Sequence, residues 1–249
     1  NKNRFLNNHF VNLFMNRIST GIPGLDELVE GGFPEGSSIL VSGGPGCGKS
    51  IFSLQYLYHG AKNLSEPGVY ITLEEGPHNL WWNMQRFKWE LLPLEKDNLL
   101  KIYKFDPTPG VTGAADVEAQ TKRIVDKARE LKAKRLVIDS ITAFTFWFKS
   151  TSDIRYAIYN LIEELRKINC TTILTCETSG KKTALSRFGV EEFLVDGVVA
   201  MHFMPPHRSL YVRKMRGTSH NALIHPMYIT DRGIEVNARE EILWEAIKD

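Results

Sequence analysis

Short apolar runs alternate along the first two thirds of the chain with longer segments in which apolar residues recur at helical spacing. Continuous apolar runs are typical of buried strands, and recurrence every three or four residues is typical of amphipathic helices. The strand-like runs are 38–41, 69–73, 99–105, 136–139 and 171–176, and the helix-like segments are 51–57, 78–91, 116–132 and 154–168. This alternation predicts an α/β fold with a mainly parallel central sheet and helices on both faces.

The pattern changes near residue 197. Short strand-like runs at 198–203, 210–215, 227–230 and 234–236 are separated by turns. They predict antiparallel strands added to the sheet near the C-terminus, followed by a short helix at 239–247. The length suits one sizeable domain, which we place at residues 17–249.

Residues 1–16 differ from the rest because asparagines are interleaved with apolar residues. A signal peptide would need an uninterrupted apolar core and a small-residue cleavage site, and neither is present. Two interpretations remain. The segment is either an arm that docks on a neighbouring subunit, or an upstream extension with Met15 as the biological start.

The composition is that of an ordinary globular protein, with 43% hydrophobic and 24% charged residues. A net charge of +2 gives no argument for nucleic acid or a membrane. No apolar stretch of about 18 residues is present, so we expect no membrane span. The three cysteines do not resemble a disulfide framework, which makes a reducing cytoplasm the simplest compartment.

A glycine-rich segment joins the first predicted strand to the first predicted helix. It reads Gly43-Gly44-Pro45-Gly46-Cys47-Gly48-Lys49-Ser50, followed by Ile51. Glycines let successive N–H groups point inward at phosphates, and the start of a helix adds positive potential. Lys49 would reach the β- and γ-phosphates, and the Ser50 hydroxyl would ligate Mg²⁺. The chain is therefore predicted to bind a nucleoside triphosphate.

Acidic residues follow two of the predicted strands. Asp139 ends the run 136–139 and has the form of a Walker B acid that holds Mg²⁺, although it could instead cap the following turn. Glu74 and Glu75 end the run 69–73, where they could polarise the attacking water or be merely solvated. We assign the base to Glu74 and a supporting role to Glu75.

A basic pair is the candidate for charge on the leaving phosphates. Lys214 and Arg216 alternate on one side of the predicted strand 210–215 and its continuation. From the spacing alone, a solvated strand face is the better explanation. Elsewhere, the aromatic residues of segment 78–91 are predicted to lie in the core: Trp81, Trp82, Phe87 and Trp89.

Taken in order, these residues resemble the KaiC-like branch of the RecA superfamily over about residues 17–237. The resemblance rests on Ser19-Thr20-Gly21-Ile22-Pro23-Gly24-Leu25-Asp26-Glu27-Leu28, Thr72-Leu73-Glu74-Glu75, Ile138-Asp139-Ser140, Arg187-Phe188-Gly189-Val190-Glu191-Glu192-Phe193 and Lys214-Met215-Arg216-Gly217-Thr218-Ser219-His220. It implies a RecA-like P-loop NTPase core that binds ATP or ADP with Mg²⁺, and a homo-oligomeric ring, commonly a hexamer, with nucleotide between subunits.

The resemblance also implies roles for individual residues. Lys214-Met215-Arg216 would contact the γ-phosphate of the neighbour's nucleotide, and Thr218, His220 and Asp231 match positions near the neighbour's ribose or base. Where one KaiC domain carries a self-phosphorylated Ser-Thr pair, this chain has Glu192-Phe193. Neither residue has a hydroxyl, which excludes self-phosphorylation at that place.

Three functions follow as alternatives. The first is a slow ATPase whose ring acts as a switch or scaffold for an unidentified protein client. The second is a RecA- or RadA-like protein that binds single-stranded DNA through loops at about 144–153 and 177–189, which combine aromatic and basic residues. The third is a nucleotide-dependent structural oligomer with negligible turnover. The near-neutral charge favours the first over the second.

Overall fold

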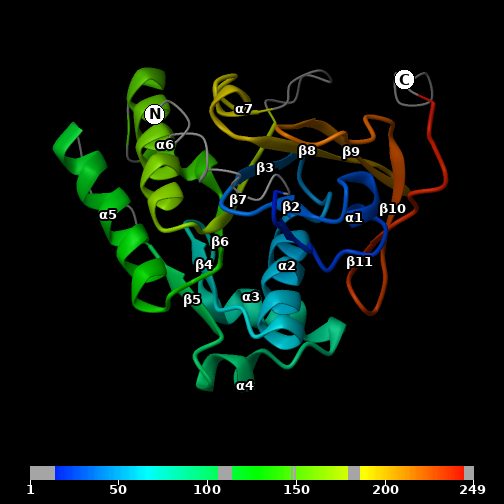
Figure 1. Cartoon of the computed structure of the whole chain (residues 1–249), viewed down its shortest axis with the longest axis horizontal. Coiled ribbons are helices and arrows are strands. Elements are labelled where there is room, and N and C mark those ends of the chain that lie inside the picture. The colour runs from blue at the N-terminus through cyan, green and yellow to red at the C-terminus, as the bar shows by residue number, and fades with distance from the viewer. Residues whose placement is uncertain (1–14, 106–113, 147, 149, 179–185, 244–249) are drawn as a thin grey trace, which may run out of the picture.

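The computed structural model describes residues 15–105, 114–146, 148, 150–178 and 186–243, with a nine-stranded sheet at its centre (Figure 1). In spatial order the strands are β11 (Ile234–Val236), β10 (His225–Ile229), β9 (His207–Met215), β8 (Gly197–Met204), β3 (Ser38–Gly43), β7 (Thr171–Cys176), β6 (Arg135–Asp139), β4 (Gly68–Thr72) and β5 (Leu100–Lys104). The strands from β8 to β5 run parallel, and β8 to β11 pair antiparallel. The predicted fold class is confirmed.

Helices cover both faces of the sheet (Figure 1). One face carries α2 (Lys49–Leu64), α3 (Pro77–Met84) and α4 (Leu91–Lys96), and the other carries α5 (Ala114–Glu130) and α6 (Thr151–Lys167). Because strand side chains alternate, Ile39 and Val41 pack toward α2 whereas Leu40 packs toward α6. The shorter elements are β1 (Arg17–Ile18), α1 (Leu25–Leu28), β2 (Phe33–Pro34), η1 (Gln85–Phe87), η2 (Ile141–Phe146) and α7 (Glu191–Leu194).

The single helix predicted at 78–91 is wrong. α3 ends at Met84, the turn η1 follows, and Lys88 takes a left-handed φ of 56° that stops the helix. A new helix, α4, then begins at Leu91, with Pro93 in its first turn, where the missing N–H costs little. Pro93 therefore lies inside a helix instead of ending one.

The aromatic residues of this segment divide between core and surface. Phe87 is buried and stacks on Trp89 with ring centroids 4.8 Å apart, and Trp81 packs against the core cluster on the α2 face. Trp82 is 68% exposed, so its predicted core position is wrong. The break after Met84 shortens the helix, and Trp82 lies on its outer side.

The helix predicted at 239–247 is also wrong where it can be described. Residues 239–243 form a turn and an isolated bridge between Ile242 and Ile224. The N–H of Ile242 donates to the Ile224 carbonyl at 2.8 Å, which holds this segment extended along the sheet edge. Residues 244–247 and 1–14, with the two interpretations offered for the N-terminal segment, lie outside the described residues. None of the helices described combines the length and apolar character needed to cross a membrane.

Candidate nucleotide site

The phosphate loop connects β3 to α2 and is shaped by two glycines. Gly48 has a left-handed φ of 105° immediately before the helix begins. A Cβ at Gly43 would lie 2.5 Å from the Met201 carbonyl oxygen and 2.6 Å from Cys47 Sγ, so only glycine fits there. The Lys49 ammonium donates to the carbonyls of Gly43 at 2.9 Å and Gly44 at 3.1 Å, which holds it over the loop. The arrangement is that of a cradle for phosphates.

The predicted magnesium residues lie together although their strands are not adjacent. β7 separates β3 from β6 in the sheet, yet the Ser50 hydroxyl donates to Asp139 Oδ2 at 2.7 Å. A hydroxyl and a carboxylate are hard oxygen donors, and Mg²⁺ is commonly held by one or two such groups together with phosphates and water. The residues therefore fit Mg²⁺.

The Asp139 carboxylate has two further partners that the sequence analysis did not single out. The Tyr70 hydroxyl donates to Oδ2, and the Thr175 hydroxyl donates to Oδ1. Tyr70 belongs to β4 and Thr175 to β7, the two strands that flank Asp139 on β6. Both partners lie in predicted buried strands, where the sequence pattern gives no indication that a hydroxyl binds a carboxylate.

The two glutamates after β4 point to different surroundings. Glu74 Oε1 accepts a hydrogen bond from the Ser140 hydroxyl at 2.6 Å. Glu75 lines the cavity above Lys49 and Ser50, and its Oε2 lies 3.4 Å from Asn83 Nδ2. Burial, and then the charges of Asp139 and Glu74, raise the pKa of Glu75 above its ordinary value. Both carboxylates thus lie at the strand end beside the phosphate loop.

The phosphate loop opens into a cavity of about 490 Å³ that includes two arginines missed by the sequence analysis. Arg86 lines it from η1 and Arg208 from β9. Arg208 Nε donates to the Gly46 carbonyl at 3.1 Å, and its guanidinium lies 4.0 Å from the ring centre of Phe203. Arg208 reaches the loop only because β9 pairs with β8 and β8 with β3, a long-range pairing that local pattern does not reveal.

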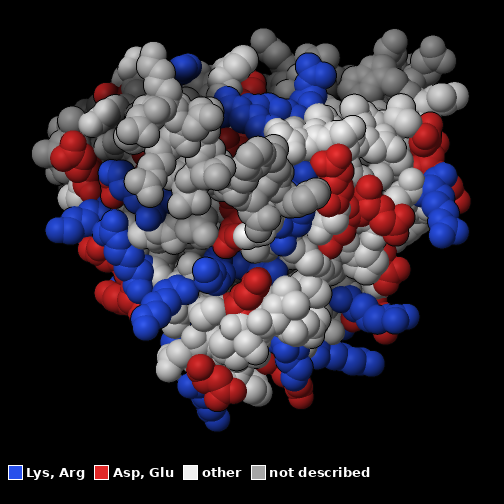
Figure 2. Space-filling view, in the orientation of Figure 1, with Lys and Arg blue, Asp and Glu red and all other residues white. Residues whose placement is uncertain are grey.

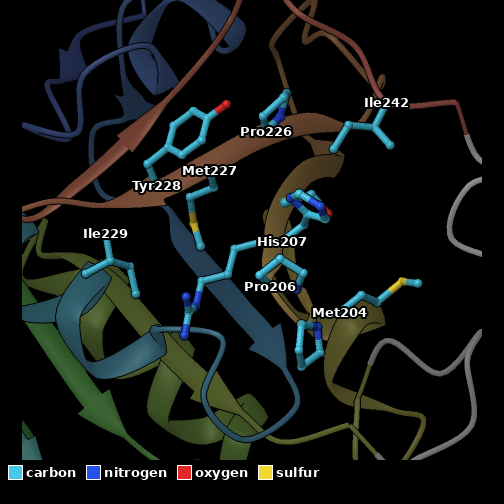
Figure 3. Close-up of a pocket in the computed structure, with 11 residues that line it drawn as sticks. Met204, Pro206, His207, Pro226, Met227, Tyr228, Ile229 and Ile242 are labelled. Carbon is cyan, nitrogen blue, oxygen red and sulfur yellow. The ribbon is translucent and has the colours of Figure 1, made fainter.

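A second cavity of about 630 Å³ (Figure 3) lies beside the first, because the two share Arg208 and Ile229 in their linings. Met227 and Tyr228 of β10 line one side, and Pro206 belongs to the turn between β8 and β9. Its lining is mainly apolar, so the space next to the phosphate cavity continues along a wall that suits uncharged groups.

The basic pair does not lie at the chain's own phosphate loop. Met215 pairs with Gly197 at the start of β8, whereas Met201, further along β8, pairs with Gly43 at the loop. Four residues of strand correspond to roughly 13 Å. Lys214 Nζ donates to the carbonyls of Glu192 at 3.0 Å and Val195 at 2.7 Å, and Arg216 pairs with Asp196 at 3.3 Å. Burial, and then the charge of Arg216, lower the pKa of Lys214.

The remaining predicted contacts are divided between the two ends of the strands. Thr218 Oγ1 accepts from Arg17 at 2.6 Å, and His220 Nδ1 is 3.4 Å from the Thr218 carbonyl, both just beyond the basic pair. Asp231 is exposed in the turn between β10 and β11. Because Met227 of β10 pairs with Arg208, this turn lies on the side of the chain's own phosphate loop. The structure thus separates Asp231 from Thr218 and His220.

Comparison with known proteins identifies the family of this chain. The sequence profile of the family described as "ATPase: KaiC" matches residues 18–241. The circadian clock oscillator protein KaiC of Prochlorococcus marinus subsp. pastoris is 40% identical over 235 residues, which are 92% of this chain and 46% of that protein. The chain therefore spans a little under half the length of the KaiC protein it matches.

Two relatives match over their whole length. A UPF0273 protein of Thermotoga maritima is 38% identical over 239 residues, with 90% of this chain and 97% of that protein covered. The crystal structure of a KaiC-like protein of Pyrococcus horikoshii superposes with a TM-score of 0.80 at 38% identity and covers 90% of this chain and 100% of that one. Residues 18–241 thus make up one KaiC-type domain, and the chain belongs to the KaiC family of nucleotide-binding ATPases.

Proposed function

We propose that this protein hydrolyses ATP slowly, with Mg²⁺, at the subunit boundaries of a homo-oligomeric ring, commonly a hexamer. One observation carries the proposal. Lys214 and Arg216 lie at the opposite end of the strands from the chain's own phosphate loop, away from the place where its own nucleotide would bind. If this end of one copy packs against the phosphate loop of a second copy, Lys214 and Arg216 of the first reach the phosphates bound by the second.

The roles of the residues follow from where they lie. Lys49 neutralises the β- and γ-phosphates, and Ser50 and Asp139 would hold Mg²⁺, which adds further positive charge when bound. Glu74, oriented by Ser140, accepts the proton of the attacking water, and Glu75 supports it from the cavity wall. Lys214 and Arg216 of the adjoining copy stabilise charge that develops on the γ-phosphate.

The basic pair has partners that it must exchange before it can reach a neighbour. Lys214 is bonded to two carbonyls at the end of α7, and Arg216 to Asp196. Arg216 is 55% exposed, so its guanidinium is accessible from outside the chain. Exchange of these bonds before each turnover supports slow hydrolysis, as suits a nucleotide-dependent switch or scaffold for a protein client.

Self-phosphorylation is not part of the proposal. Glu192 accepts a hydrogen bond from Ser186, and Phe193 is 65% exposed at the position where a KaiC domain carries hydroxyls. The three cysteines are free and buried, which suits a reducing cytoplasm.

The decisive experiment mixes two inactive variants. Glu74→Gln removes the proton acceptor of a chain's own site, and a double Lys214→Ala, Arg216→Ala variant removes the charge given to the neighbour's site. The Glu74→Gln chain still supplies the basic pair, and the double variant still supplies Glu74. If sites are shared, about a quarter of the boundaries in random mixed rings combine these two intact halves and become active. No activity from a mixture that light scattering shows to contain mixed rings, or full activity of a wild-type monomer, would refute the shared site.

Single-stranded DNA binding remains the alternative to be tested. Two aromatic residues of the first proposed DNA loop, Phe144 and Phe148, are buried and pack edge to face at 5.9 Å, so they offer no surface for base stacking. The structure does not describe the side chains of the other aromatic and basic residues of these loops: Phe146, Trp147, Lys149, Lys181 and Lys182. On the face in Figure 2, basic and acidic side chains are interspersed.

Steady-state ATP hydrolysis with and without single-stranded DNA distinguishes the alternatives. We expect slow hydrolysis that does not respond to DNA. Strong stimulation by DNA would instead favour the recombinase-like function.

A further inference from the structure

Three hydroxyl groups from three different elements bind one carboxylate. Ser50 of α2 and Tyr70 of β4 both donate to Asp139 Oδ2, and Thr175 of β7 donates to Oδ1. Of the three, Ser50 belongs to the phosphate-loop motif. The other two have no place in the roles given above, and they approach Asp139 from the strands on either side of it.

The register of the sheet explains why they meet. Thr72 pairs with Asp139 and Tyr70 with Val137, so Tyr70 and Asp139 project from the same face. On the other side, Ile138 pairs with Leu174, which brings Thr175 beside Asp139. This face is the one that α2 covers, and α2 carries Ser50 to the same place.

The burial of these hydroxyls argues that they serve the carboxylate. The side chains of Tyr70 and Thr175 are completely buried. A buried hydroxyl is unfavourable unless it is bonded, and phenylalanine or valine would fill the same space without that penalty.

The three bonds leave Asp139 with little freedom. A carboxylate offers about four acceptor positions, so three donors leave roughly one, on Oδ1. With its rotation fixed from both neighbouring strands, the carboxylate presents that position in a constant direction. A group that orients a metal-binding carboxylate in this way strengthens metal binding without touching the metal.

We propose that Tyr70 and Thr175 are positioning residues that orient Asp139 for Mg²⁺, and that they set how strongly Mg²⁺ tightens nucleotide binding. The inference rests on the proposed function, because it assumes that Asp139 serves Mg²⁺ beside a bound nucleotide.

The test compares the affinity for a fluorescent ADP analogue in Mg²⁺ and in EDTA, with Mn²⁺ binding to the ADP complex followed by electron paramagnetic resonance. Tyr70→Phe keeps the ring and removes only the hydroxyl. We expect its gain in affinity from Mg²⁺, and its Mn²⁺ affinity, to fall about tenfold while the affinity in EDTA is unchanged. Thr175→Val should behave similarly, and Thr175→Ser, which restores a hydroxyl, should recover most of the gain.

Tyr56→Phe is the matched control. Tyr56 is also a fully buried tyrosine, but its hydroxyl donates to the Thr171 carbonyl at 3.3 Å, away from Asp139. It should leave the effect of Mg²⁺ unchanged. If Tyr70→Phe keeps the wild-type gain, or loses affinity equally in Mg²⁺ and EDTA, the positioning role is refuted. A wild-type protein that shows no gain from Mg²⁺ would refute the magnesium site itself, and with it the proposed function.

Discussion

At the scale of single residues, the site is defined by which oxygen atoms face each other. Glu74 is held by Ser140 at 2.6 Å, whereas Glu75 lines the cavity with a raised pKa. Two adjacent carboxylates of the same type thus have different environments, and different environments give different roles. This difference in environment is the structural basis on which we propose different roles for Glu74 and Glu75.

Glu74→Gln should abolish hydrolysis and preserve binding. Glutamine can still accept from Ser140 but cannot take a proton from water, so we expect turnover to fall by about two to four orders of magnitude. Nucleotide affinity and assembly should be unchanged, as measured by fluorescence titration and light scattering. Glu75→Gln is the matched comparison and should reduce turnover less. Unchanged ATP consumption by Glu74→Gln would show that the base is assigned wrongly.

The short motif at 43–50 was predicted to join a strand to a helix, and it does so in the structure, where β3 ends at Gly43 and α2 begins at Lys49. Arg208 and Tyr70 could not be found in this way. Arg208 reaches Gly46 through two strand pairings, and Tyr70 stands in the apolar run of β4, where its hydroxyl is indistinguishable from ordinary core filling.

At the scale of elements, Asp196, which lies just before β8, links β3, α6 and the segment that follows β9. Its carboxylate accepts from the N–H and hydroxyl of Ser38, both at 3.0 Å, and from Arg166 of α6 at 2.8 and 2.9 Å. Arg216 of the segment after β9 adds an ion pair at 3.3 Å. Burial would raise the pKa of Asp196, but the bonds from Ser38 and Arg166 outweigh it, and the pKa is lowered.

Asp196 should therefore make the fold sensitive to acid. Because its pKa in the folded state lies below the ordinary value of 3.8, its contribution is complete at neutral pH and is lost as the pH falls below about 4. Asp196→Asn should lower the free energy of unfolding at pH 7 by about 1 kcal/mol, a figure reduced for partial exposure, and flatten its decrease below pH 4. Urea denaturation at several pH values measures both effects.

Glu163→Gln is the control for this experiment. It removes the exposed partner of Arg166, which lies 2.6 Å away, and leaves Asp196 in place. Acid sensitivity should then match that of the wild type. If the acid sensitivity of unfolding changes equally in both variants, the effect comes from Arg166 and its surroundings and not from Asp196.

Element boundaries were predicted well where one apolar face is long. α6, predicted at 154–168, is found at Thr151–Lys167, and it begins where the Ser150 hydroxyl accepts from the Asp153 N–H at 3.0 Å. The pattern failed at 78–91 and 239–243 for different reasons. A left-handed Lys88 breaks the first, and pairing of Ile242 with Ile224 draws the second into an extended conformation. Neither cause is local to the apolar spacing.

At the scale of the whole molecule, the two halves of the proposed site lie at opposite ends of the strands of one sheet. A nucleotide bound between copies would hold both, so occupancy and assembly should be coupled. We expect wild-type protein with Mg²⁺ and ATP to have about six times the 28.4 kDa chain mass, and to dissociate when nucleotide is removed. Light scattering on both samples measures this.

Variants of the basic pair test the same coupling. Lys214→Ala and Arg216→Ala should weaken assembly and hydrolysis while nucleotide affinity of the separate chains is kept. A stable ring of unchanged mass without nucleotide would show that other contacts hold the copies together.

The position of Lys214 and Arg216 determines which subunit of a mixed assembly loses activity when one subunit is mutated. Under the proposed arrangement, a polypeptide that lacks this pair still carries a complete phosphate loop, and it hydrolyses its bound ATP when a normal neighbour supplies the pair. The normal copy that should receive Lys214 and Arg216 from it loses ATP hydrolysis, although its own sequence is intact. Such variants should therefore be dominant when they are produced together with the normal chain.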